Sequence, residues 1–194
     1  MTSFWTTSTG EDLAQTEAPK EFDAGGGDFE LIPDNSTVLA FIEDAKWAEG
    51  RDDDGNPRYI NIKWKVQEPE QVARRVVFQK LWVKDPEPNA LKKGKDEADK
   101  KRDKAMRMLS TIDANAGGKL AKNGGEPSDD QLALALVNKA MTITVKIWEI
   151  GGNSGNWVAA VAPKGAKDLD VKGAPETKGG GSLADDLEDD VPFN

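Results

Sequence analysis

The stretch RYINIKWKVQ, residues 58–67, decides the fold class because its apolar and polar side chains alternate without interruption. An alternation of period two is typical of a β-strand that turns one face to a core and the other to solvent. The solvent face of this strand is basic and carries one aromatic ring. The predicted core face consists of Ile60, Ile62, Trp64 and Val66, and the opposite face of Tyr59, Asn61, Lys63 and Lys65.

Four further segments carry strand patterns, with β-branched and aromatic residues between turn signals. Residues 52–57 and 151–155 are rich in Asp, Asn and Gly, and they predict hairpin turns between neighbouring strands. The chain therefore predicts five strands in all. The four further segments are residues 37–47, 74–83, 140–150 and 157–162.

A helical insertion separates the third and fourth predicted strands. Residues 95–114 carry apolar side chains at helical spacing, and Gly117 and Gly118 end this helix. Ser128 is placed to cap a second, short helix. Five strands with a helix between the third and fourth form the layout of the OB fold, a small, partly open barrel. We predict a mainly β fold, a five-stranded OB-type barrel with a helical insertion and disordered termini, and keep a β-sandwich or α+β domain as the alternative.

The acidic residues are concentrated toward the two ends of the chain. Of the net charge of −9, residues 1–27 and 171–194 carry −4 each, whereas residues 28–170 carry −1. Within this middle part, residues 74–122 hold 14 basic and 7 acidic residues, so a basic region lies between acidic arms. We expect a flexible acidic arm at 1–27, one folded domain at 28–170, and a disordered linker with an acidic tail at 171–194.

The sequence contains neither cysteine nor histidine. Their absence excludes disulfides, thiol nucleophiles, histidine general bases and the common zinc sites, so we expect no cofactor and no metal. The sequence also shows no apolar run of about 18 residues and no basic, apolar leader. These features predict a cytoplasmic protein without a membrane partner.

An OB barrel that binds single-stranded DNA needs cations that follow the phosphates and flat rings on which bases stack. The less buried register of the predicted strands supplies both, and Arg74 and Arg75 lie beside it. We therefore interpret residues 28–170 as a nucleic-acid-binding domain, with Trp47 and Trp157 as further candidates near the hairpin ends. The predicted DNA-binding residues are Tyr59, Lys63, Lys65, Arg74, Arg75, Phe78, Lys80, Trp82, Lys146 and Trp148.

The chain ends in LADDLEDDVPFN, residues 183–194, with five carboxylates in six positions. Such a segment has too little apolar surface to fold by itself. Its apolar end has the properties of a docking peptide, because it combines one rigid residue with one aromatic anchor. We expect the tail to bind partner proteins and to compete with DNA for the basic face. The predicted partner-binding residues are Asp185, Asp186, Glu188, Asp189, Asp190, Val191, Pro192 and Phe193.

The tail resembles the C-terminal tip of bacterial single-stranded DNA-binding proteins, which usually ends in a run of Asp followed by Ile-Pro-Phe. In that family the tip docks replication and repair enzymes and the Phe is the last residue, whereas here Asn194 follows Phe193. The segments YINIKWKVQEP, RRVVFQKLWV, KRDKAMRMLSTID and GNWVAAVAP resemble phage-encoded OB-fold single-stranded DNA-binding proteins over roughly residues 28–164. The resemblance implies a non-catalytic, sequence-tolerant DNA-binding protein of phage replication, recombination and repair, in the cytoplasm of the infected host.

Two other classes of function stay open. A nuclease or hydrolase with a carboxylate-bound metal would use clusters of Asp and Glu, and magnesium-dependent cleavage of an oligonucleotide would reveal it. A protein that acts only through its tail would bind host enzymes but no DNA. The sequence is also compatible with a homo-oligomer, and it leaves the preference among DNA, RNA and duplex open.

Overall fold

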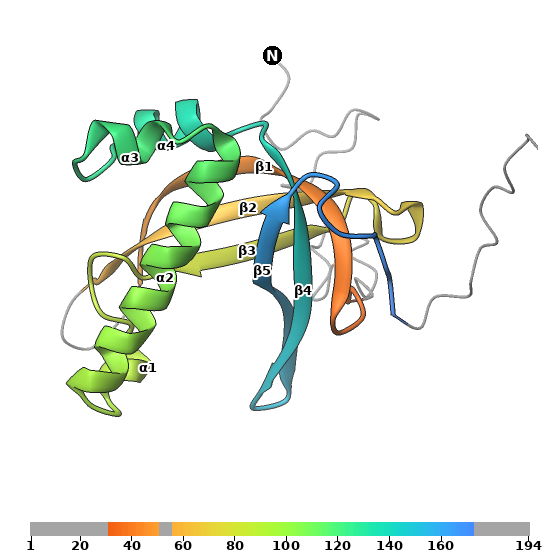
Figure 1. The fold of residues 1–194 in the computed structure, drawn as a ribbon. Coiled ribbons are helices and arrows are strands. Elements are labelled where there is room, and N and C mark those ends of the chain that lie inside the picture. Colours follow the sequence, from red (N-terminus) through yellow and green to blue (C-terminus); the bar gives the residue numbers. More distant parts are fainter. Residues whose placement is uncertain (1–30, 51–55, 173–194) are drawn as a thin grey trace, which may run out of the picture. The chain divides into compact units, whose positions relative to one another are not determined.

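The computed structural model describes residues 31–50 and 56–172 as a mainly β unit (Figure 1). Residues 1–30, 51–55 and 173–194 lie outside the described part. The predicted N-terminal arm, most of the first predicted hairpin turn and the acidic tail therefore lie outside it as well. Gly50 and Pro57 lie on either side of this turn, and the Gly50 amide donates a 2.8 Å hydrogen bond to the Pro57 carbonyl.

The described part confirms the five predicted strands and the helix predicted between the third and fourth. A short 3₁₀ turn follows the second strand, and three shorter helices accompany the long one. The strands are β1 (Ser36–Glu49), β2 (Arg58–Glu68), β3 (Val76–Leu81), β4 (Ala140–Ile150) and β5 (Asn153–Pro163), and the helices are α1 (Pro88–Leu91), α2 (Lys95–Ala116), α3 (Lys119–Asn123) and α4 (Asp129–Leu136).

The five strands form one antiparallel sheet in the order β3-β2-β1-β4-β5. The first strand is shared, because residues 36–41 pair with β4 and residues 39–49 pair with β2. The edge strands β3 and β5 approach each other to within 8 Å between Cα atoms, but no ladder joins them and the sheet stays open. Helix α2 contacts both edge strands, and in Figure 1 it passes in front of the end of β3, with β5 beside it.

The strand β1 is strongly curved (Figure 1). Its register with β2 shifts in the middle, where Ile42 pairs with Trp64 but Asp44 pairs with Lys63. Glu43 is thus the extra residue of a β-bulge, and a bulge bends its strand and increases the local twist. This bend lets one strand serve both halves of the sheet.

The core lies on one face of the sheet, under the helices. The predicted core face of β2 is confirmed, since Ile60, Ile62, Trp64 and Val66 are at most 2 % exposed. The Trp64 indole donates a buried hydrogen bond of 2.9 Å to the Gln79 carboxamide on β3, so the largest core side chain has its polar atom satisfied. Other strand residues that are fully buried are Val38, Ala40, Ile42, Met141, Ile143 and Val145, and helix residues are Ile112, Leu132 and Leu136.

Local signals for the helix ends are confirmed. The Ser128 hydroxyl accepts a hydrogen bond from the Gln131 amide, and the Gln131 side chain accepts one from the Ser128 amide, which is a capping box. Helix α2 ends at Gly117, whose φ of 115° is a left-handed conformation that side chains other than glycine rarely adopt. None of the helices among the described residues is long and apolar enough to cross a membrane.

Several segment ends differ from the prediction. Strand β3 ends at Leu81, not at residue 83, and β5 begins at Asn153, not at residue 157, so it includes part of the second predicted hairpin turn. Arg74 and Arg75 precede β3 instead of belonging to it, because Arg74 has a φ of 69° and its amide donates back to the Val66 carbonyl. Residues 164–172, which carry no periodic pattern, return to β1. There Thr37 and Asp170 exchange two backbone hydrogen bonds of 2.7 and 2.9 Å.

The hydrogen bond between Trp64 and Gln79 predicts a clear effect on stability. The substitution Gln79→Ala leaves the indole N–H buried without a partner, and we expect the free energy of unfolding to fall by about 1–3 kcal/mol. The matched control is Gln67→Ala on the exposed end of β2, where a change within about 0.5 kcal/mol is expected. Urea unfolding followed by circular dichroism measures both. Equal losses in the two variants would show that the buried hydrogen bond is unimportant.

Candidate nucleic-acid interface

The outward side of β2 and β3 forms a continuous surface that we call the β2–β3 face. It arises because the residues that alternate with the core residues on these two strands all point the same way. The cross-strand pairs join Asn61 to Lys80, Lys63 to Phe78 and Lys65 to Val76. The members of the face are Tyr59, Asn61, Lys63 and Lys65 from β2, and Val76, Phe78, Lys80 and, just beyond β3, Trp82.

One pair of this face has the composition that single-strand binding requires. Phe78 is 54 % exposed, which is unusual for a large aromatic side chain, and Lys63 lies directly opposite on β2. Side chains of directly opposed residues on an antiparallel pair are about 4.5–5.5 Å apart at Cβ. A base stacked on Phe78 would therefore bring a phosphate within reach of Lys63.

The aromatic residues at the far end of the face pack on one another. Trp82 lies against Tyr59 with ring centroids 4.7 Å apart, and the Lys80 ammonium lies 5.2 Å from the Tyr59 centroid. Tyr59 is consequently only 8 % exposed, so it supports Trp82 and offers little surface of its own. A Cβ at Gly50 would lie 2.8 Å from the Trp82 ring, and glycine permits this close approach.

The cations of the face are partly neutralised by strand β1. The Glu43 carboxylate contacts the Lys63 ammonium at 2.6 Å and the Lys65 ammonium at 3.3 Å. The hydrogen bond from Lys63, followed by that from Lys65, holds the pKa of Glu43 below its usual range. Beside it, the Asp44 carboxylate binds Lys46 at 2.8 Å, and this hydrogen bond raises the pKa of Lys46.

The predicted DNA-binding residues of β4 belong to a second group, toward the other end of β1. Val145 on β4 pairs with Ser36, the first residue of β1, so Lys146 and Trp148 lie beyond that end of the strand. Lys63 on β2 lies opposite Asp44, farther along β1. Trp148 covers Gly155, where a Cβ would lie 2.7 Å from the ring, and Lys146 pairs with Trp157. Trp148 and Trp157 are 39 % and 43 % exposed, so this hairpin carries exposed rings and a cation as well.

The remaining candidates lie beside the face or belong to the scaffold. Arg74 and Arg75 immediately precede Val76, at the end of the β2–β3 face, and the Arg75 guanidinium donates a 3.5 Å hydrogen bond to the Gln71 carbonyl. Trp47 has a structural role instead. Its indole donates a 2.7 Å hydrogen bond to the Pro127 carbonyl, and its register partner on β2 is the core residue Ile60.

Sequence reasoning did not identify Glu43 as part of this surface or predict its bulge. A signal for the bulge is present in β1. Its apolar residues that are at most 1 % exposed are Val38, Ala40 and Ile42, at a spacing of two, and the next one is Ala45. This step of three residues in a strand of period two indicates one inserted residue.

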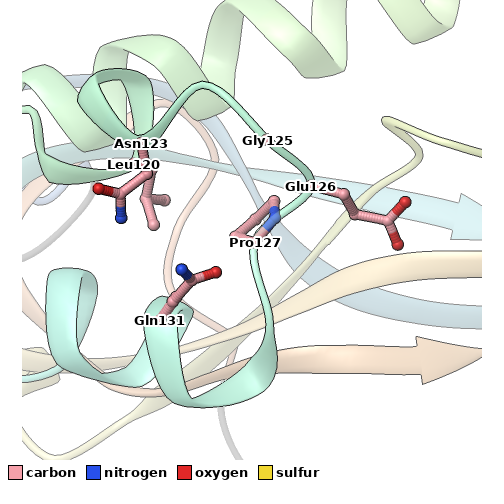
Figure 2. A pocket seen from close by; sticks show the side chains of 6 residues that line it. All are labelled: Leu120, Asn123, Gly125, Glu126, Pro127 and Gln131. Carbon is pink, nitrogen blue, oxygen red and sulfur yellow. The ribbon is translucent and has the colours of Figure 1, made fainter.

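A shallow hollow lies between α3 and α4 (Figure 2). Figure 2 shows the Asn123 and Gln131 side chains facing it, while the Glu126 carboxylate points away. Gln131 is used in the capping box and Glu126 binds Lys84 at 2.9 Å, so these polar groups already serve the scaffold. The lining residues are Leu120, Asn123, Gly125, Glu126, Pro127 and Gln131, and none is a predicted DNA-binding residue.

Comparisons with known proteins leave the chain without an assigned family. No protein-family profile matches the sequence, and no curated protein matches it. Among residues 31–50 and 56–172, no three acidic side chains gather where they could hold a metal ion.

The contacts of Glu43 predict a measurable titration. We expect its pKa, followed by carbon-detected NMR, to rise in Lys63→Met and to rise less in Lys65→Met, because Lys63 makes the stronger hydrogen bond. Since the folded-state pKa is depressed, the ion pairs stabilise the protein above the unfolded-state pKa, and this contribution is lost as the pH falls through the folded-state pKa. Lys100→Met, which removes an exposed charge on α2, is the control. An unchanged pKa in both β2 variants would contradict the assignment.

Proposed function

We propose that the chain is a non-catalytic, sequence-tolerant single-stranded DNA-binding protein of phage replication or recombination. The observation that carries the proposal is the β2–β3 face, where the exposed ring of Phe78 lies opposite Lys63 and beside further cations. Base stacking is tolerant of sequence because every base has a π-face, and backbone contacts carry no sequence information. The surface suits a flexible polyanion with accessible bases.

The strand arrangement supports an OB-type barrel as the scaffold of this function. The order β3-β2-β1-β4-β5, the shared strand β1 and the helix between β3 and β4 agree with the five-stranded OB layout. The approach of β3 to β5, with α2 against both, agrees with a barrel that is partly open. The OB fold binds oligonucleotides with the face of its second and third strands, which is where the exposed rings and cations lie.

The proposed binding mode assigns different roles to the site residues. Phe78 and Trp82 stack bases, and Tyr59 supports Trp82. The hairpin of β4 and β5 offers a second stacking position at Trp148, with Lys146 beside it. The side chains that would contact phosphates on the β2–β3 face are Lys63, Lys65, Arg74, Arg75 and Lys80.

The biological setting and the partners are proposed from the sequence resemblance. The acidic tail, Asp185 to Phe193, would recruit replication and repair proteins in the cytoplasm of the infected bacterial host. Its carboxylates would also compete with DNA for the basic face, because a tethered anion has a high effective concentration near its own domain. A homo-oligomer is compatible with this role.

The first test removes the most exposed ring of the face. In a titration with fluorescently labelled oligo-dT at low salt, Phe78→Ala should weaken binding by about 1–3 kcal/mol, the usual contribution of one base stack. Leu134→Ala on α4 removes another exposed apolar side chain and should bind like the wild type. Duplex and RNA competitors define the preference. An absence of binding by the wild-type protein would refute the proposed function, and equal binding by Phe78→Ala would refute the assigned face.

The second test addresses the tail. Deletion of residues 183–194 removes a tethered polyanion, so the shortened protein should bind oligo-dT more tightly at low salt and equally at high salt. The same titration, repeated over a range of salt concentrations, measures the effect. Equal affinity with and without the tail at low salt would show that the tail does not compete.

A further inference from the structure

The Glu43 carboxylate contacts two lysines of the β2–β3 face at once. Its two carboxylate oxygens each contact one lysine, with Oε2 at 2.6 Å from Lys63 and Oε1 at 3.3 Å from Lys65. A phosphate group also presents two or more anionic oxygens to neighbouring ammonium groups. The carboxylate is itself partly exposed, with 32 % of its side-chain surface accessible, so it can be displaced from the surface without unfolding the strand.

The bulge in β1 places this carboxylate there. Because Glu43 is the inserted residue, Glu43 and Asp44 both oppose Lys63 from the outward side. Asp44 is already paired with Lys46, which leaves Glu43 to face the lysines of β2. Exposed ion pairs contribute little to stability, and the backbone ladder between β1 and β2 already fixes the two strands. The stability of the sheet therefore gives little reason for a carboxylate between these two lysines.

We propose that Glu43 is a built-in competitor for the DNA backbone, which a bound strand must displace from Lys63 and Lys65. This inference rests on the proposed function and adds a determinant of ligand length to it. A ligand with one phosphate exchanges one anion for another and gains little. A longer strand gains further contacts to Lys80 and the arginines and a base stack on Phe78, so it displaces Glu43. The protein thereby selects polynucleotides over mononucleotides and other small phosphates.

The salt dependence of binding distinguishes this role from a general charge effect. Binding of a single strand releases counterions, and the affinity falls with a slope of about −0.7 per neutralised phosphate in a logarithmic plot. Salt also screens the ion pairs of Glu43 with Lys63 and Lys65, so the competition with DNA weakens as the salt concentration rises and offsets part of the loss of affinity. Removal of the carboxylate should therefore make the salt dependence steeper as well as the binding tighter.

The experiment compares Glu43→Gln with Glu126→Gln in the full-length protein. Glu126 also bridges two cations, Lys84 at 2.9 Å and Arg58 at 3.6 Å, but Arg58 shares the register of the core residue Ile60, not that of the β2–β3 face. Labelled oligo-dT is titrated by anisotropy at several salt concentrations. For Glu43→Gln we expect roughly threefold to tenfold tighter binding at low salt and a slope steeper by about 0.7–1.4. Glu126→Gln should stay within about twofold of the wild type.

A double-mutant comparison completes the test. In the Lys63→Met background, Glu43→Gln should lose most of its effect, because one of the two cations that it frees is absent. Glu43→Ala provides a second variant should the glutamine form new hydrogen bonds to the lysines. If the wild type binds DNA but both Glu43 variants bind with the same affinity and slope, the competitor role is overturned while the proposed function stands. If the wild type binds no DNA, both are overturned.

Discussion

The bulge at Glu43 is the constraint on which both halves of the structure depend. A strand that pairs with β4 at its start and with β2 at its end must bend, and one inserted residue supplies the bend. The same insertion changes which positions point inward, so that Ile42 before it and Ala45 after it both reach the core. Without it, a register of strict period two would turn Asp44 into the core, where an unpaired carboxylate is costly.

The core and the β2–β3 face are two products of the same register. Trp64 is fully buried and bonded to Gln79, and its neighbours along the chain, Lys63 and Lys65, must therefore point outward. A slip of one residue would exchange the two sets at once. The core thus fixes where the cations lie, and exposed side chains of the face such as Phe78 need not contribute to folding. This separation explains how Phe78 can stay exposed on a well-packed sheet.

Features that depend on local pattern could be predicted from the sequence, and features that depend on distant contacts could not. Strand faces, the extent of α2 and the cap at Ser128 follow from periodicity and single-residue preferences. The cover of Trp82 over Tyr59 requires two strands in register, and the pairing of Thr37 with Asp170 joins segments far apart in the chain. The turn at Arg74 depends on a hydrogen bond to Val66. The bulge lies between these cases. The spacing of three residues from Ile42 to Ala45 in β1 can be read along the chain, but the contact of Glu43 with the lysines of β2 depends on how the two strands pair.

In the proposed binding mode, the balance of forces on the face would favour single strands over duplex. Lys63 and Lys65 share their charge with Glu43, and exposed charges are screened within about 8 Å at physiological salt, so backbone attraction alone is a weak contribution. Stacking on Phe78 is not screened in this way. The bases of a duplex are paired and stacked on one another, so a duplex presents only its phosphates to this surface. If Glu43 opposes the phosphates and Phe78 attracts the bases, as proposed, the discrimination between single strand and duplex would arise because the electrostatic contribution is weak.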